Sequence, residues 1–135
     1  MTPKEVVKRF YSLDFVKDNN VLEYIHKDCI LHWNSSKGYM CSNYKMIEER
    51  IATLKKAFHS FTYKLSHLLE DNNNTVTARY TIYVTSIENP QEEEVLAHFI
   101  TIWEIKDQQL YKGYEISQLG DDTPENLQAF SEINV

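Results

Sequence analysis

The feature that most constrains the fold is the alternation of apolar and polar residues that begins after Ser60 and continues, with short breaks, to Leu119. A period of two is typical of β-strands, because successive side chains point to opposite faces of a sheet. In 75–85 one parity is entirely apolar, with Val76, Ala78, Tyr80, Ile82 and Val84. Turn-forming or charged residues interrupt the alternation between its segments. The pattern therefore predicts four antiparallel strands over 61–69, 75–85, 95–105 and 110–119.

Two of these strands carry further predictions. In 61–69 the period of two places one set of side chains on a single face, namely Phe61, Tyr63, Leu65, His67 and Leu69. The segment 95–105 is apolar on both parities, which is typical of a strand whose two faces are both covered.

The remaining segments predict mainly helices. Thr2-Pro3-Lys4-Glu5 has the composition of a helix start, with Thr2 as the cap and Pro3 at the first helical position. A longer helix follows a cap at Ser42, because Ile47, Ile51, Leu54 and Phe58 recur at helical spacing. The other predicted elements are a short helix over 21–26, a strand over 28–34 that ends in the turn 35–38, and a short C-terminal helix at about 123–133 bearing Leu127, Phe130 and Ile133.

This order of elements predicts an α+β fold in which a curved, mainly antiparallel sheet wraps around N-terminal helices. Such a sheet forms a cone-shaped cavity. The chain has 135 residues, of which 42% are hydrophobic, so it can build one core, and we expect a single domain over 1–135.

The charge balance and the N-terminal sequence restrict the expected binding partners and the expected cellular location. Lys and Arg number 14 against 20 Asp and Glu, a net charge of −6 that disfavours nucleic-acid binding. The N-terminus lacks a basic start followed by a long apolar run, so we expect no membrane segment and a cytoplasmic location. Cys29 and Cys41 are then predicted to be reduced thiols.

The sequence lacks the motifs of several common enzyme and cofactor-binding classes. The three glycines form neither a dinucleotide-binding nor a Walker A pattern, and no nucleophile elbow or zinc-protease pair occurs, so no cofactor is expected. His26, Cys29, His32 and Cys41 are residue types that bind zinc. Cys29 and His32 lie three positions apart in a predicted strand and face opposite sides, so we expect no metal site.

The element order resembles that of the nuclear transport factor 2-like superfamily, especially its SnoaL-like and ketosteroid-isomerase-like branches, which have a cystatin-like cone fold. The resemblance spans the chain to about Leu119 and is carried by Val6–Tyr11, Lys27–Leu31 and the closing hairpin from Phe99 to Tyr114. It implies a cavity that binds small hydrophobic molecules and a homodimer through the outer face of the sheet.

The known catalytic positions of these branches are not matched. The ketosteroid-isomerase tyrosine falls on Phe10, and the two aspartates fall near Trp33 and Ala97. The SnoaL-like acid–base aspartate falls on Gln118, whose amide cannot transfer a proton in that role. An Asp-Arg-Asp set like that of limonene-epoxide hydrolases is not evident, with Arg79 the only arginine among the predicted strands.

The resemblance and the strand parity together predict a ligand pocket, unless the same aromatic side chains simply fill a closed core. The predicted pocket residues are Phe10, Trp33, Tyr63, Ala97, Phe99, Thr101, Trp103, Tyr114 and Gln118. On the opposite parity Leu96, His98, Ile100 and Ile102 need a cover, for which we expect a second copy of the chain.

Three functions stay open at this stage. The first is binding of a small apolar or aromatic molecule without a known family chemistry. The second is an enzyme of isomerase, cyclase or dehydratase type, with His32, His98, Glu115 and Gln118 as the candidate groups; a glutamate in a strand can equally lie on a solvent-facing position. The third is a protein-interaction module that docks through the C-terminal helix.

Overall fold

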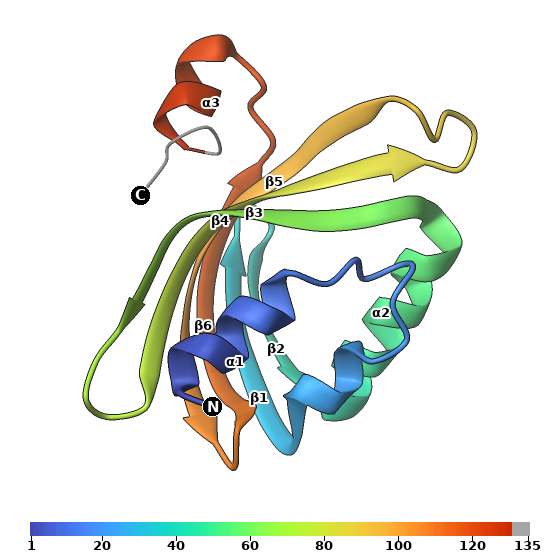
Figure 1. Ribbon diagram of the computed structural model, residues 1–135. Coiled ribbons are helices and arrows are strands. Elements are labelled where there is room, and N and C mark those ends of the chain that lie inside the picture. The colour runs from blue at the N-terminus through green and yellow to red at the C-terminus, as the bar shows by residue number, and fades with distance from the viewer. Residues whose placement is uncertain (131–135) are drawn as a thin grey trace.

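A six-stranded sheet organises the protein in the computed structural model, which describes residues 1–130 (Figure 1). Its order is β2-β1-β6-β5-β4-β3, in which β1 and β6 are parallel and the other neighbours are antiparallel. The strands are β1 (Ile25–Ser35), β2 (Gly38–Asn43), β3 (Phe58–Glu70), β4 (Thr75–Ser86), β5 (Glu93–Lys106) and β6 (Gln109–Leu119). The predicted α+β class and curved, mixed sheet are confirmed.

The helices are α1 (Pro3–Tyr11), the short 3₁₀ helix η1 (Val21–Tyr24), α2 (Tyr44–Ala57) and α3 (Pro124–Ala129). Figure 1 shows α1 and α2 on one side of the sheet and α3 apart from them, beyond the end of β6. Thr2 caps α1 as predicted, because its hydroxyl accepts a hydrogen bond from the Glu5 amide at 3.2 Å.

The hairpin before α2 corrects two predictions. β2 was not predicted, and it pairs with β1 after a turn at Ser36 and Lys37. Its first residue, Gly38, has a φ of 108°, which favours glycine. The cap of α2 is Asn43, whose side chain accepts from the Met46 amide, and not Ser42. Ser42 is instead fully buried in β2. The predicted short helix is also shorter than expected, since His26 already belongs to β1.

A β-bulge corrects the predicted face of β3. Leu65 pairs with Tyr80, but His67 pairs with Arg79, so one extra residue interrupts the alternation. After the bulge Leu68 packs against the core, whereas Leu69 is 59% exposed. Phe61, Tyr63 and Leu65 keep the predicted face, and His67 and Leu69 do not.

The core lies between the concave face of the sheet and α1 and α2. All five apolar residues of the predicted inner parity of β4 are buried, which confirms that assignment. From α1, Phe10 contacts Trp103 at a ring-centroid distance of 6.4 Å, and Tyr11 contacts Tyr63 at 5.0 Å. On the opposite parity of β5, Ile100 and Ile102 are each 40% exposed in the single chain, whereas His98 is buried, so their cover by a second copy stays a prediction.

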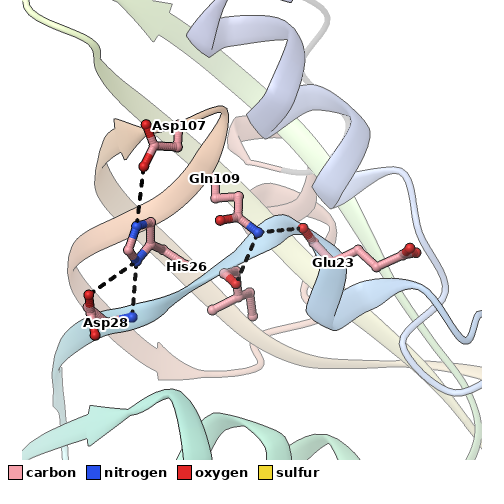
Figure 2. A network of polar contacts seen from close by, with 6 residues as sticks. Glu23, His26, Asp28, Asp107 and Gln109 are labelled. Atoms are coloured by element: carbon pink, nitrogen blue, oxygen red, sulfur yellow. Dashed lines mark hydrogen bonds and ion pairs between the residues drawn. The ribbon is translucent and has the colours of Figure 1, made fainter.

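A polar network closes the end of the sheet where β1 begins and β5 turns into β6. Gln109 donates through Nε2 to the carbonyl oxygens of Glu23 and Ile25, at 3.0 and 3.5 Å. Figure 2 shows the His26 ring between Asp28 and Asp107, with Nε2 at 3.6 Å from the Asp107 carboxylate. The β1–β6 register shifts between Ile25 and Ile30 beside these contacts, so the network joins the two strands where their ladder is interrupted.

The C-terminal segment lies on the chain's own sheet. The Arg79 guanidinium lies 3.5 Å from the centroid of the Phe130 ring and donates to the Ala129 carbonyl oxygen. Phe130 also contacts His98, and Leu127 is partly buried. α3 confirms the predicted helix over Pro124–Ala129, and Ile133 lies outside the described residues.

Among the helices of residues 1–130, none combines the length and the apolar run needed to cross a membrane. The cytoplasmic location stays a prediction. Over the same residues no three His, Cys, Asp or Glu side chains converge as a metal site would require. Cys29 is buried, whereas Cys41 is exposed in β2 opposite His32, and neither is in a disulfide.

Candidate functional site

A cavity of about 320 Å³ opens between α1, α2 and the concave face of the sheet. Its size is at the lower end of the range for sites that take drug-sized molecules. Seven of the nine predicted pocket residues line it: Phe10, Trp33, Tyr63, Ala97, Phe99, Trp103 and Gln118.

Aromatic rings form a large part of the cavity wall. Tyr80 and Phe99 are stacked at 5.4 Å and nearly parallel, and Trp33 also stacks against Phe99 at 6.1 Å. The exposed lining residues Ser36, Lys37 and Leu119 mark the mouth, where the β1–β2 turn faces the end of β6. The cavity therefore has an apolar interior and a more polar entrance.

Two predicted pocket residues do not line the cavity. Thr101 is fully buried behind the wall, where its hydroxyl bonds to Tyr80 and Glu115. Tyr114 lies on the outer face, 42% exposed and stacked on His32 at 5.2 Å. The reason is the register of β6, which pairs Tyr114 with Ile102 and Glu115 with Thr101.

The two candidate histidines also lie outside the cavity. His32 stacks between Tyr39 and Tyr114 on the outer face. His98 is buried on that face, where its Nδ1 is 2.9 Å from the Thr81 hydroxyl and its Nε2 accepts from the Asp121 amide at 3.0 Å. A backbone amide only donates, so Nε2 carries no proton and the ring is neutral in this arrangement. Neither histidine can act on a molecule in the cavity.

Glu115 is the carboxylate that the fold places in the cavity wall. The Thr101 hydroxyl donates to its Oε1 at 3.1 Å. Oε2 forms no hydrogen bond with residues 1–130, and no buried oxygen or nitrogen atom of their side chains lacks a partner. Oε2 is therefore accessible from the cavity, while Thr101 holds Oε1.

A chain of hydrogen bonds leads from the Trp103 indole to the Glu115 carboxyl through three hydroxyl groups. The Trp103 indole donates to Tyr11 at 2.8 Å, the Tyr11 hydroxyl donates to Tyr80 at 3.3 Å, and Tyr80 lies 2.8 Å from the Thr101 hydroxyl. An ionised carboxylate can only accept, so when Glu115 is deprotonated the Thr101 hydroxyl donates to Oε1, Tyr80 donates to Thr101, and Tyr11 donates to Tyr80. Oε1 is then the terminal acceptor of the chain, and Oε2 is the oxygen that no residue of 1–130 holds by a hydrogen bond.

Burial sets the proton affinity of this carboxyl. The apolar wall raises the pKa of Glu115 from 4.5 to about 7, against smaller opposing effects of the Thr101 hydrogen bond and the Arg50 charge. Burial also raises the pKa of Tyr80 well above its ordinary value, so the phenol keeps the proton that it donates. Glu115 can thus exist in both protonation states near neutral pH, which suits a general acid or base.

Arg50 on α2 brings a cation to the same cavity. Its Nη2 donates to the buried Ser42 hydroxyl at 2.6 Å, and its guanidinium carbon lies 5.5 Å from the centroid of the Trp33 ring. Ser42 and Trp33 therefore fix the position of Arg50 at the wall.

Sequence reasoning weighed Glu115 only as one of several weak candidates and missed Arg50, Tyr11 and Tyr80. The alternation in β4 did mark Tyr80 as inward, and the helical spacing in 44–57 places Arg50 three residues after Ile47 and one before Ile51. These signals give a face but not a cavity, because the same inward positions serve a filled core.

No family model matches the sequence, and no characterised protein matches it significantly. Solved structures match closely in shape. IdmH from Streptomyces antibioticus, proposed to be a polyketide cyclase, has a TM-score of 0.67 and 15% identity over 87% of this chain and 92% of its own.

Two further structures extend the likeness. A SnoaL-like protein from Shewanella denitrificans, also proposed to be a polyketide cyclase, has a TM-score of 0.64 and 8% identity, covering 85% of this chain and 89% of its own. A Catenulispora acidiphila protein with a ketosteroid isomerase-like fold has a TM-score of 0.61 and 12% identity, covering 99% and 96%. At these identities the likeness establishes the fold alone. The chain therefore has the nuclear transport factor 2-like fold, in the form found in SnoaL-like and ketosteroid-isomerase-like proteins.

Proposed function

We propose that the protein binds a small, mainly aromatic molecule in the cone cavity and that Glu115 exchanges a proton with it. The observation that carries this proposal is the Glu115 carboxyl, which lies in a largely apolar, aromatic-rich wall with Oε1 held by Thr101 and Oε2 accessible. The proposal joins the predicted binding function to the predicted isomerase, cyclase or dehydratase alternative. The acid–base group is Glu115, in place of a pocket histidine.

The residues of the chain support proton abstraction and return. Deprotonated Oε2 can accept a proton from a carbon next to a carbonyl group, and the protonated carboxyl can then return it to another atom of the same molecule. Proton transfers of this kind occur in isomerisation, cyclisation and dehydration. The polyketide-cyclase assignments proposed for two of the structural neighbours are compatible with this class of reaction.

Binding can be tested with 2-naphthamide, a neutral aromatic probe, by isothermal titration calorimetry. Ala97→Trp places a large ring in the cavity wall, so we expect it to abolish binding. Ala52→Trp, at an exposed position of α2, is the matched control and should bind as the wild type does. Equal binding by wild type and Ala97→Trp, or no binding by the wild type, would contradict the proposed cavity site.

Proton transfer can be tested with 5-nitrobenzisoxazole, which opens to a coloured phenolate when a base removes its ring proton. We expect the wild type to accelerate this reaction with a rate that rises with pH through about 7. Glu115→Gln should lose at least about a hundredfold of that rate, the usual contribution of a positioned base. The exposed Glu48→Gln controls for loss of one charge. A Glu115→Gln protein with wild-type activity would refute the role of Glu115.

We also propose that two copies of the chain pair through the outer face of the sheet. This face carries Ile100, Ile102, Tyr114 and Ile116, which are 40–61% exposed. Ile100 and Ile116 are direct cross-strand partners, so they form one continuous apolar patch with the pair Ile102 and Tyr114. Light scattering should show a dimer for the wild type and a monomer for Ile116→Lys. A monomeric wild type at micromolar concentration would contradict this assembly.

A further inference from the structure

The cation in the cavity wall suggests what kind of molecule the proposed site takes. Arg50 lies beside Trp33, and its hydrogen-bond partners are the Ser42 hydroxyl and, at 3.4 Å, the Met40 sulfur, both through Nη2. Nε and Nη1 make no hydrogen bond with residues 1–130. Within those residues no carboxylate lies within ion-pair distance of Arg50, since the ion pairs there are those of His26. The guanidinium thus has free donors at the cavity.

Glu115 is not the counterion of Arg50. The two side chains line the same cavity and feel each other's charge, but they form no ion pair. A guanidinium presents its N–H groups as a planar fork that matches a carboxylate, and it is always charged. In a largely apolar cavity such a group gains most from an anionic partner that arrives with the ligand.

We propose that the ligand of this cavity is an aromatic carboxylic acid whose carboxylate binds Arg50 while its ring packs against Trp33 and Phe99. This inference rests on the proposed function, because it assigns the substrate class of the same cavity. Arg50 then fixes one end of the molecule, and Oε2 of Glu115 remains available to a different atom. The exposed Lys37 at the mouth adds a second positive charge along the entry route.

The test compares 2-naphthoate with 2-naphthamide, which have nearly the same shape and differ in charge. Titration calorimetry at about pH 6 keeps Glu115 mostly protonated, because its pKa is about 7, while the naphthoate stays ionised. We expect the wild type to bind naphthoate at least about tenfold more tightly than naphthamide. Arg50→Met should remove this preference and leave the affinity for naphthamide within about twofold.

Two further variants test whether the preference depends on the Arg50 guanidinium itself or only on positive charge. Arg50→Lys keeps the charge but not the fork, so we expect it to retain part of the preference. Arg9→Met removes one positive charge from an exposed position of α1 and should retain all of it. If Arg50→Met fails to fold, the partial loss in Arg50→Lys carries the test.

The outcomes distinguish the inference from the proposed function. Equal binding of the two probes by the wild type, or a preference that persists in a folded Arg50→Met protein, would overturn the anion site and leave the cavity site standing. Failure of the wild type to bind either probe would contradict both. A naphthoate preference that Arg50→Met and Arg9→Met abolish equally would show a general charge effect and would also overturn the inference.

Discussion

Replacing Glu115 by Gln should make the protein more stable at alkaline pH. The side chain keeps nearly the same shape, but it can no longer become charged within the cavity wall. In the folded protein burial raises the pKa of Glu115 from 4.5 to about 7. Each pKa unit corresponds to about 1.4 kcal/mol, so the folded state disfavours the ionised carboxyl by about 3 kcal/mol.

The direction of this pH effect on stability depends on which state, folded or unfolded, binds the proton of Glu115 more tightly. Between pH 4.5 and about 7 the unfolded chain has released this proton and the folded protein still holds it. The contribution of Glu115 to the free energy of unfolding therefore falls as pH rises through this range, and it is constant above it. Glu115→Gln removes this loss. Relative to the wild type, the variant should gain about 3 kcal/mol on going from pH 4.5 to pH 8.

Urea denaturation of both proteins at the two pH values measures the difference. Titration of all other groups cancels when the wild type is subtracted from the variant at each pH. Glu48→Gln, at an exposed position, controls for the loss of one negative charge. The reasoning is refuted if Glu115→Gln has the same stability relative to wild type at pH 4.5 and at pH 8.

Three further predictions concern the groups around the site. Thr101→Val removes the hydrogen bond that lowers the pKa of Glu115, so the pH profile of proton abstraction should move to higher pH; an unmoved profile would contradict the contact. Burial lowers the pKa of His98, so its stabilising contribution is lost as pH falls below the ordinary value of 6.5. Protonation of Nε2 also ends its role as acceptor for Asp121 and Asn126, and the amide NMR signals of 121–130 should change in that range but not in a His98→Gln control. Gly113→Ala should cost about 1–3 kcal/mol by chemical denaturation, because the added methyl would lie 2.6 Å from buried side-chain atoms; unchanged stability would show that the neighbours yield freely.

The succession of the last four strands along the chain and the inner face of β4 could be predicted, because the alternation of apolar and polar residues is clear there and strict in β4. Bulges could not, since a single extra residue in β3 leaves the composition unchanged but reverses every later side chain. The missed strand β2 is short and mostly exposed, so it carries no alternating apolar pattern.

The residues of the cavity were harder to predict from the sequence than the strands. In the middle of β6 the inward positions hold Gly113, Glu115 and Ser117, while Tyr114 and Ile116 face outward. Hydrophobicity alone predicts the reverse, with Tyr114 and Ile116 inward. The exposed Ile116 and the inward glutamate both depart from the usual pattern, and such departures occur where a protein binds another molecule.

The most direct measurement is an NMR titration of the side-chain carboxyl carbons in protein labelled with ¹³C-glutamate, with and without 2-naphthamide. The signal absent from Glu115→Gln identifies the group. We predict that this carboxyl titrates near pH 7 and that the bound probe shifts its signal or its midpoint. A Glu115 carboxyl that titrates in the ordinary acidic range and does not respond to the probe would contradict both the buried acid–base group and the cavity site.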